Sequence, residues 1–173
     1  RLSGAAGAGG EPRGFRRLLL GQCQSAFERL FEAGRPADPP QDSELEQELG
    51  ARRKRRALGN VKLVGHLLVR GMLTARLLVE CADALLAARA TCPEALESLA
   101  ALLMVAGPRF DRASWRGRER LDAVFAAVAE LAADKAVPTR VRFLLRDVVD
   151  LRRAGWRQPA RRAAEPEGPM RLV

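Results

Sequence analysis

The fold class is decided by residues 58–74, LGNVKLVGHLLVRGMLT. Apolar side chains recur there at intervals of three and four residues, which places them on one stripe of a helix: Val61, Val64, Leu67, Leu68 and Met72. Three glycines, Gly59, Gly65 and Gly71, interrupt the stretch, although a glycine inside a helix costs about 0.8–1 kcal/mol relative to alanine. We therefore expect the glycines to allow close contact with another helix, so that this stretch is one element of a stack.

The composition of the whole chain favours helix. Its 173 residues suit one domain with a substantial core. Leu, Ala and Val supply most of the 47% of residues that are hydrophobic, whereas aromatic residues make up 5% and Tyr is absent. Because Leu and Ala favour helices and strand-favouring residues are scarce or scattered, the sequence predicts an all-α fold.

The net charge is strongly positive. Thirty Lys and Arg residues against 21 Asp and Glu residues give a charge of +9. A basic surface favours RNA or an acidic protein as a partner. An enrichment of the whole chain in Arg, Ala, Gly and Pro would produce the same excess, so both interpretations stay open.

The cysteines and the hydropathy indicate an intracellular protein. Cys23, Cys81 and Cys92 are odd in number and form no CxxC pair, as expected for isolated reduced thiols. No uninterrupted apolar run approaches the ~18 residues of a membrane span, and the first residues lack the apolar segment of a secretory signal. We expect a cytoplasmic location and no membrane partner.

Changes in composition divide the chain into three parts. Residues 1–14 are rich in Gly and Ala and are predicted to be disordered, and an Arg/Pro-rich tail at 158–173 is predicted to be disordered too. A helical pattern runs through 15–157. Within it, a first helix over about 15–34 is followed by a proline-rich linker at 35–42.

The second helix is predicted to begin at Ser43, which with Glu46 has the form of a capping box. This helix starts acidic and then turns basic, an order that suits the helix dipole. It either ends near Gly59 or continues to about Gly71, and we favour the longer helix.

Start and stop signals predict four more helices. The first of these is predicted over 75–89, with Thr74 as its N-cap. The second begins at residues 91–94 and ends at Gly107 and Pro108. The third begins at Ser114 and ends at Val137 and Pro138, and the last begins at Thr139. Consecutive helices are expected to pair as antiparallel hairpins with a period near 40–45 residues. That period is typical of HEAT-type repeats and predicts a superhelical stack.

Four stretches together resemble the middle domain of the eukaryotic translation initiation factor 4 gamma scaffold. They are FRRLLLGQCQSAFE at 15–28, RRALGNVKLVGHLLVRGMLT at 55–74, CPEALESLAALLMVAGPRFD at 92–111 and RVRFLLRDVVDLRRAGW at 140–156. All four occur in the order and at the separations of that family, and the resemblance covers about 15–157. Residues 1–14 do not resemble the family's first repeat, and the tail departs from its closing helix.

The resemblance implies a partial HEAT-repeat fold that begins at the second repeat. It also implies a non-catalytic scaffold of cap-dependent translation initiation that needs no cofactor. Family members bind the DEAD-box RNA helicase of initiation, stimulate its ATPase cycle, bind mRNA and work with other initiation factors. Without a first repeat, we expect weaker helicase binding. A related adaptor in mRNA decay or processing, a basic RNA-binding module without a helicase partner, and a non-functional fragment remain as alternatives.

The resemblance places the helicase contact on the last predicted helix. Arg140 and Arg142 correspond to basic positions flanking the helicase-facing surface, Phe143 corresponds to an aromatic position, and Arg146 completes the set. Asp147 and Asp150 are interpreted first as partners of arginines within the domain.

The predicted RNA contact is the basic run Arg52, Arg53, Lys54, Arg55 and Arg56, extended by Lys62. Five adjacent cations on a helix point in every direction, so about three share a face that a phosphate backbone could follow. The run contains no aromatic residue, which argues against base stacking and sequence specificity. The alternative is a solvated helix face.

No pattern in the sequence indicates an enzyme. His66 is the only histidine, so an ordinary zinc site would need distant carboxylates. We find no nucleophile–base pair and no phosphate-binding glycine loop of the GxxxxGK type. Trp115 and Trp156, at predicted helix ends, are expected to cover the core.

Overall fold

A computed structural model describes residues 21, 25, 43–90, 92 and 94–157. Within these residues it contains helices and no strand, which confirms the all-α prediction. The elements are α2 (Ser43–Val69), α3 (Arg76–Ala87), the short 3-10 helix η1 (Ala88–Ala90), α4 (Glu94–Phe110), α5 (Arg118–Ala133) and α6 (Thr139–Arg153). The predicted first helix, apart from residues 21 and 25, and both predicted disordered ends lie outside the described residues.

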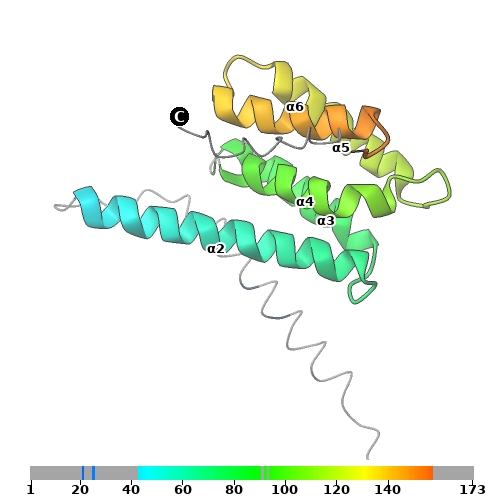
Figure 1. Ribbon diagram of the computed structural model, residues 1–173, viewed down its shortest axis with the longest axis horizontal. Coiled ribbons are helices and arrows are strands. Elements are labelled where there is room, and N and C mark those ends of the chain that lie inside the picture. The colour runs from blue at the N-terminus through cyan, green and yellow to red at the C-terminus, as the bar shows by residue number, and fades with distance from the viewer. Residues whose placement is uncertain (1–20, 22–24, 26–42, 91, 93, 158–173) are drawn as a thin grey trace, which may run out of the picture.

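The helices form two layers. α2, α4 and α6 run side by side in one layer, and α3 and α5 lie behind them, so that consecutive helices alternate between the layers (Figure 1). α4 is the central element, because it packs against α2 on one side, α6 on the other and α3 behind. This is the stack of helical hairpins that the spacing of the stop signals predicts.

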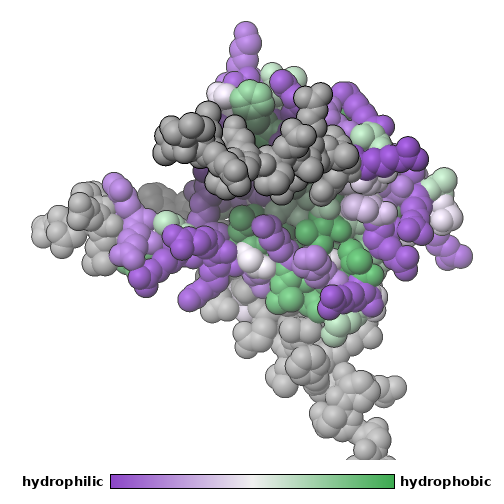
Figure 2. Space-filling view, in the orientation of Figure 1, coloured by the Kyte–Doolittle hydropathy of each residue, from purple (hydrophilic) through white to green (hydrophobic). Residues whose placement is uncertain are grey.

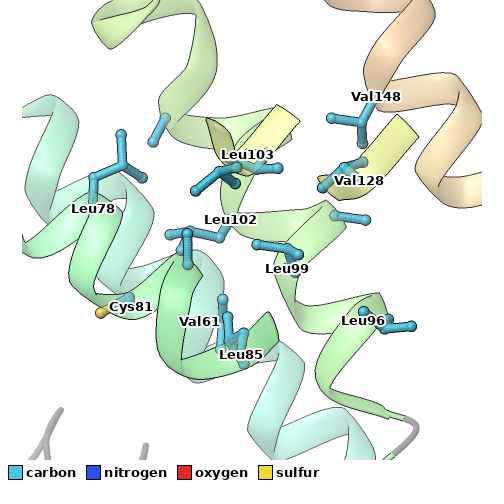
Figure 3. Packing of buried hydrophobic residues seen from close by; sticks show 14 of the residues in the cluster. Val61, Leu78, Cys81, Leu85, Leu96, Leu99, Leu102, Leu103, Val128 and Val148 are labelled. Atoms are coloured by element: carbon cyan, nitrogen blue, oxygen red, sulfur yellow. The ribbon is translucent and has the colours of Figure 1, made fainter. Parts of the chain in front are cut away.

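The core lies between the two layers. Leucines of α3 and α4 fill its centre, and each of the other α-helices adds at least one buried valine (Figure 3). Fully buried residues include Leu68, Leu78, Leu85, Leu99, Leu102, Leu103, Leu121 and Leu145. These buried residues recur along each helix with the apolar spacing that predicts the helices. The same residues therefore define each helix and pack it against its neighbours.

Only one of the three glycines in 58–74 allows a close helix–helix contact, as we expected for all three. A Cβ at Gly65 would lie 3.0 Å from Cγ1 of Val105 on α4, so this glycine sets the close approach of α2 to α4. Gly59 faces open space. Gly71 lies beyond the end of α2 with φ +70°, a conformation that glycine adopts without strain.

Three predicted helix boundaries are wrong. The N-cap of α3 is Ala75, with no side-chain hydrogen bond, so Thr74 does not cap this helix. α5 begins at Arg118, with Gly117 as its N-cap. Residues 111–117 form a turn in which Trp115 packs against Phe110, so Ser114 lies in this turn and not at the start of the helix.

The third error concerns α4, which passes through Gly107 and Pro108 and ends at Phe110. Pro108 removes one hydrogen bond, to the carbonyl of Met104, whose side chain lies on the exposed face of the helix. A glycine before the proline relieves the clash that otherwise keeps this position out of the helical region. The helix can therefore continue for one more turn.

The end of the described chain folds back onto α4. Trp156, with φ 62°, places its indole directly over Gly107, where a Cβ would lie 2.1 Å from the ring. The indole Nε1 donates a hydrogen bond to Oδ2 of Asp111 at 3.0 Å, and the ring meets Phe125 edge-on at 6.0 Å. As predicted, this tryptophan covers the core.

Asp111 also anchors a charged cluster that joins three helices. Arg152 of α6 donates two hydrogen bonds of 3.0 Å to it, contacts Asp122 of α5, and lies 4.2 Å above the ring of Phe125. Burial would raise the pKa of Asp111, but the hydrogen bonds from Arg152 and Trp156 outweigh it and hold the pKa below its ordinary value. The carboxylate is therefore ionised and paired at neutral pH.

Candidate functional surface

The basic run predicted to bind RNA lies on the N-terminal half of α2, ahead of the part of the helix that packs on α4. Hydrophilic residues are spread along this half of α2 (Figure 2). Arg52 pairs with Glu48 one turn earlier, at 2.7 Å, and because both side chains are largely exposed to water the pair contributes only about 0.3–0.5 kcal/mol. Arg53, Arg55, Arg56 and Lys62 are exposed, and no ion pair to them is found among the described residues.

Lys54 differs from the rest of the run, because it turns toward α4. Its Nζ lies 2.8 Å from Oε1 of Glu97, a carboxylate in the first turn of α4 whose side chain is only 10% exposed. The second oxygen of the same carboxylate lies 3.7 Å from Nη2 of Arg140, at the start of α6. No sequence pattern singles out Glu97, yet it brings together one residue from each predicted contact.

The predicted helicase contact on α6 divides into exposed and packed residues. Phe143 is 56% exposed, the largest value among the large hydrophobic residues of the described chain, and Arg146 lies with Cζ 5.7 Å from its ring centre. Arg140 is 75% exposed. Arg142 is half-buried: its Nη2 donates to Oγ1 of Thr139 at 3.0 Å, and its Nε is buried without a partner among the described residues.

The two aspartates of α6 have different surroundings. Asp150 pairs with Arg153 at 3.4 Å on the surface, as its spacing predicts. Asp147 is exposed, and no arginine partner is found for it among the described residues. Our interpretation of these residues as partners within the domain therefore holds for Asp150.

Features that would support catalysis are not found in the part of the chain that the structure describes. Its His, Cys, Asp and Glu residues form no group of three that could hold a metal ion. Cys81 and Cys92 are buried, and burial raises the pKa of the Cys92 thiol, which makes it less reactive. Across the described residues, no helix has the length and hydropathy needed to cross a membrane.

Comparison with known proteins places this arrangement in a family. The chain is 36% identical over 166 residues to eukaryotic translation initiation factor 4G of Oryza sativa subsp. japonica, covering 91% of this chain and 9% of the relative. Identity to eukaryotic translation initiation factor 4 gamma of Schizosaccharomyces pombe is 35%, and to factor 4 gamma 1 of Mus musculus 34%, each covering 82% of this chain and 10% of the relative.

The chain thus spans about a tenth of the length of these relatives. The resemblance carried by the four sequence stretches is confirmed. Residues 11–154 match the MIF4G domain, a helical repeat domain, and the chain therefore belongs to the MIF4G domain family.

Proposed function

We propose that this chain is a non-catalytic scaffold domain of cytoplasmic translation initiation, which binds a DEAD-box RNA helicase through α6 and RNA through α2. The observation that carries the proposal is its similarity, over most of its length, to proteins named as translation initiation factors. The two exposed surfaces described above supply the contacts, and the other initiation factors are further candidate partners.

The helicase contact is centred on Phe143. An aromatic ring that is more than half exposed adds little to the core, whereas aromatic and arginine side chains are the residues that most often dominate protein interfaces. Arg146 beside the ring would meet an acidic surface of the helicase. Arg142 contributes less, because Thr139 holds it and part of its guanidinium is buried.

The RNA contact depends on phosphate recognition. Arg53, Arg55 and Arg56 are exposed and bear no competing carboxylate within the described residues, so their donors are available to phosphate oxygens. Successive residues on a helix are rotated by about 100°, so these three do not all face one strand of RNA. We therefore expect moderate, sequence-independent affinity that falls as the salt concentration rises.

The helicase contact is tested by titrating helicase ATPase activity, in the presence of RNA, with the wild type and with Phe143→Ala. We expect the variant to need at least about tenfold more protein for half-maximal stimulation, as for an interface hot spot. Met104→Ala, at an exposed apolar position of α4, is the matched control and should behave as the wild type. Equal stimulation by all three proteins would contradict the assignment of Phe143.

The RNA contact is tested with the triple variant Arg53→Gln, Arg55→Gln and Arg56→Gln. Anisotropy of a labelled 20-nucleotide oligo(U) should show weaker binding. The salt dependence should also become shallower, by about 0.7 in log K per log salt for each phosphate that is no longer bound. A triple variant at Arg116, Lys135 and Arg153, also to Gln, removes the same charge elsewhere. If both variants bind with equally reduced affinity, only the net charge matters and the basic run is a solvated helix face.

Two alternatives have their own outcomes. An adaptor of mRNA decay or processing would bind a different DEAD-box protein, so a pull-down should compare the initiation helicase with those partners. A basic RNA-binding module would bind RNA with no helicase effect at any concentration.

A further inference from the structure

The family resemblance predicts that Arg140 contacts the helicase. In the structure it shares a carboxylate with Lys54, a residue of the basic run predicted to bind RNA. We propose that Arg140 belongs to the RNA-binding surface, where it and Lys54 form a two-cation phosphate site that extends from α2 across α4 to α6. This inference rests on the RNA binding proposed above.

Glu97 is what makes the site possible. Its side chain is only 10% exposed, and it lies in the first turn of α4, where the helix dipole favours a negative charge. It holds Lys54 at 2.8 Å by one oxygen and Arg140 at 3.7 Å by the other. Two side chains from helices that flank α4 are thereby neighbours over its N-terminal end.

The pair keeps the capacity to bind an anion. Two cations against one carboxylate leave a positive charge at this position. Lys54 donates one of its three ammonium protons to Glu97, and its side chain is still 36% exposed. Arg140 is 75% exposed, and its contact with Glu97 is longer than a hydrogen bond, so its guanidinium donors remain available. A phosphate group bridging the two would complete the neutralisation.

The site changes the expected path of the RNA. If only the run on α2 bound RNA, the backbone would follow the axis of one helix, and most of its cations would point away. With Arg140 included, the strand crosses the layer of α2, α4 and α6, which run side by side in Figure 1. Arg53 or Arg55 would then hold the adjoining phosphates.

The experiment compares Arg140→Gln with Arg146→Gln, an exposed arginine of the same helix beside Phe143. We expect Arg140→Gln to weaken binding of a labelled 20-nucleotide oligo(U) by about fivefold at about 0.1 M salt, and to lower the salt slope by about 0.7. Half-maximal helicase stimulation should stay within about twofold of the wild type. Arg146→Gln should show the reverse pattern, and Lys135→Gln should change neither.

Each outcome has one meaning. If Arg53→Gln weakens RNA binding but Arg140→Gln does not, the composite site is wrong and the proposed RNA binding stands. If Arg140→Gln instead impairs helicase stimulation, the original assignment of this residue is correct. If the wild type binds no RNA, both proposals fail. Thermal unfolding of Arg140→Gln should match the wild type, because the side chain is largely solvent-exposed.

Discussion

Replacing Gly107 by alanine tests how the end of the described chain is held. Alanine is the better helix former by about 0.8–1 kcal/mol, so helix propensity alone predicts stabilisation of α4. The structure predicts the opposite, because the new Cβ would lie 2.1 Å from Cη2 and 2.4 Å from Cζ2 of Trp156. No small shift relieves contacts that short, and the indole must leave its site.

The cost follows from the contacts that the indole makes. Its hydrogen bond to the ionised Asp111 contributes about 1.5–3 kcal/mol, and its edge-on contact with Phe125 about 0.5–1.5 kcal/mol. Because the strain of a Cβ before proline offsets the gain in helix propensity, we expect Gly107→Ala to lower the free energy of unfolding by about 2–4 kcal/mol. For a domain of this size, that corresponds to a fall in Tm of roughly 4–16 °C.

Thermal and urea unfolding followed by circular dichroism, combined in a double-mutant cycle with Trp156→Ala, separate this cause from others. Once the indole is absent, Gly107→Ala should be close to neutral, because the gain in helix propensity offsets the strain of a Cβ before proline. A destabilisation of the same size in both backgrounds would show that Trp156 is not responsible and refute the reasoning.

Three further predictions concern stability. Gly59→Ala should raise the free energy of unfolding by up to about 1 kcal/mol, because the added Cβ meets open space. Gly65→Leu should lower the free energy of unfolding by more than about 2 kcal/mol, because Val105 occupies the space next to Gly65. Urea unfolding measures both changes. Asp111→Asn should destabilise the domain at neutral pH. The folded-state pKa of Asp111 lies below its unfolded value, so its contribution is complete above about pH 4 and is lost as the pH falls through the folded pKa. Stability of Asp111→Asn should therefore depend less on acid, and equal acid sensitivity of the two proteins in urea titrations at about pH 7 and about pH 3 would contradict this. Glu97→Ala should lower stability by about 3 kcal/mol or less, with Lys54 left partly buried and unpaired, and an unchanged Tm would show that the bridge contributes nothing.

Local patterns in the sequence predicted most of the helices, because the residues that define each helix also make its contacts. α6 begins at Thr139, as predicted, and α2 runs without a break from Ser43 to Val69. One boundary that failed, the end of α4, involves a tertiary contact. Nothing near Pro108 in the sequence shows that Trp156, far along the chain, stabilises that turn of α4.

The candidate functional surface was predictable only in part. Exposed cations in an uninterrupted run, and an aromatic residue on the polar side of α6, are visible in the sequence. Glu97 was not, since an acidic residue in the first turn of a helix is already explained by the helix dipole. Its role depends on Lys54 and Arg140, both distant along the chain, which only the packing of α2 and α6 on α4 brings within reach.

The central position of α4 has a consequence for how disturbances spread. In a stack where each helix packs mainly on its neighbours, local unfolding begins at the outer helices and proceeds inward one helix at a time. The exposed N-terminal half of α2 should exchange its amide hydrogens with solvent first, while the leucine-rich middle of α4 should exchange last. Partners that bind the outer helices would therefore stabilise the parts of the molecule that unfold locally most readily.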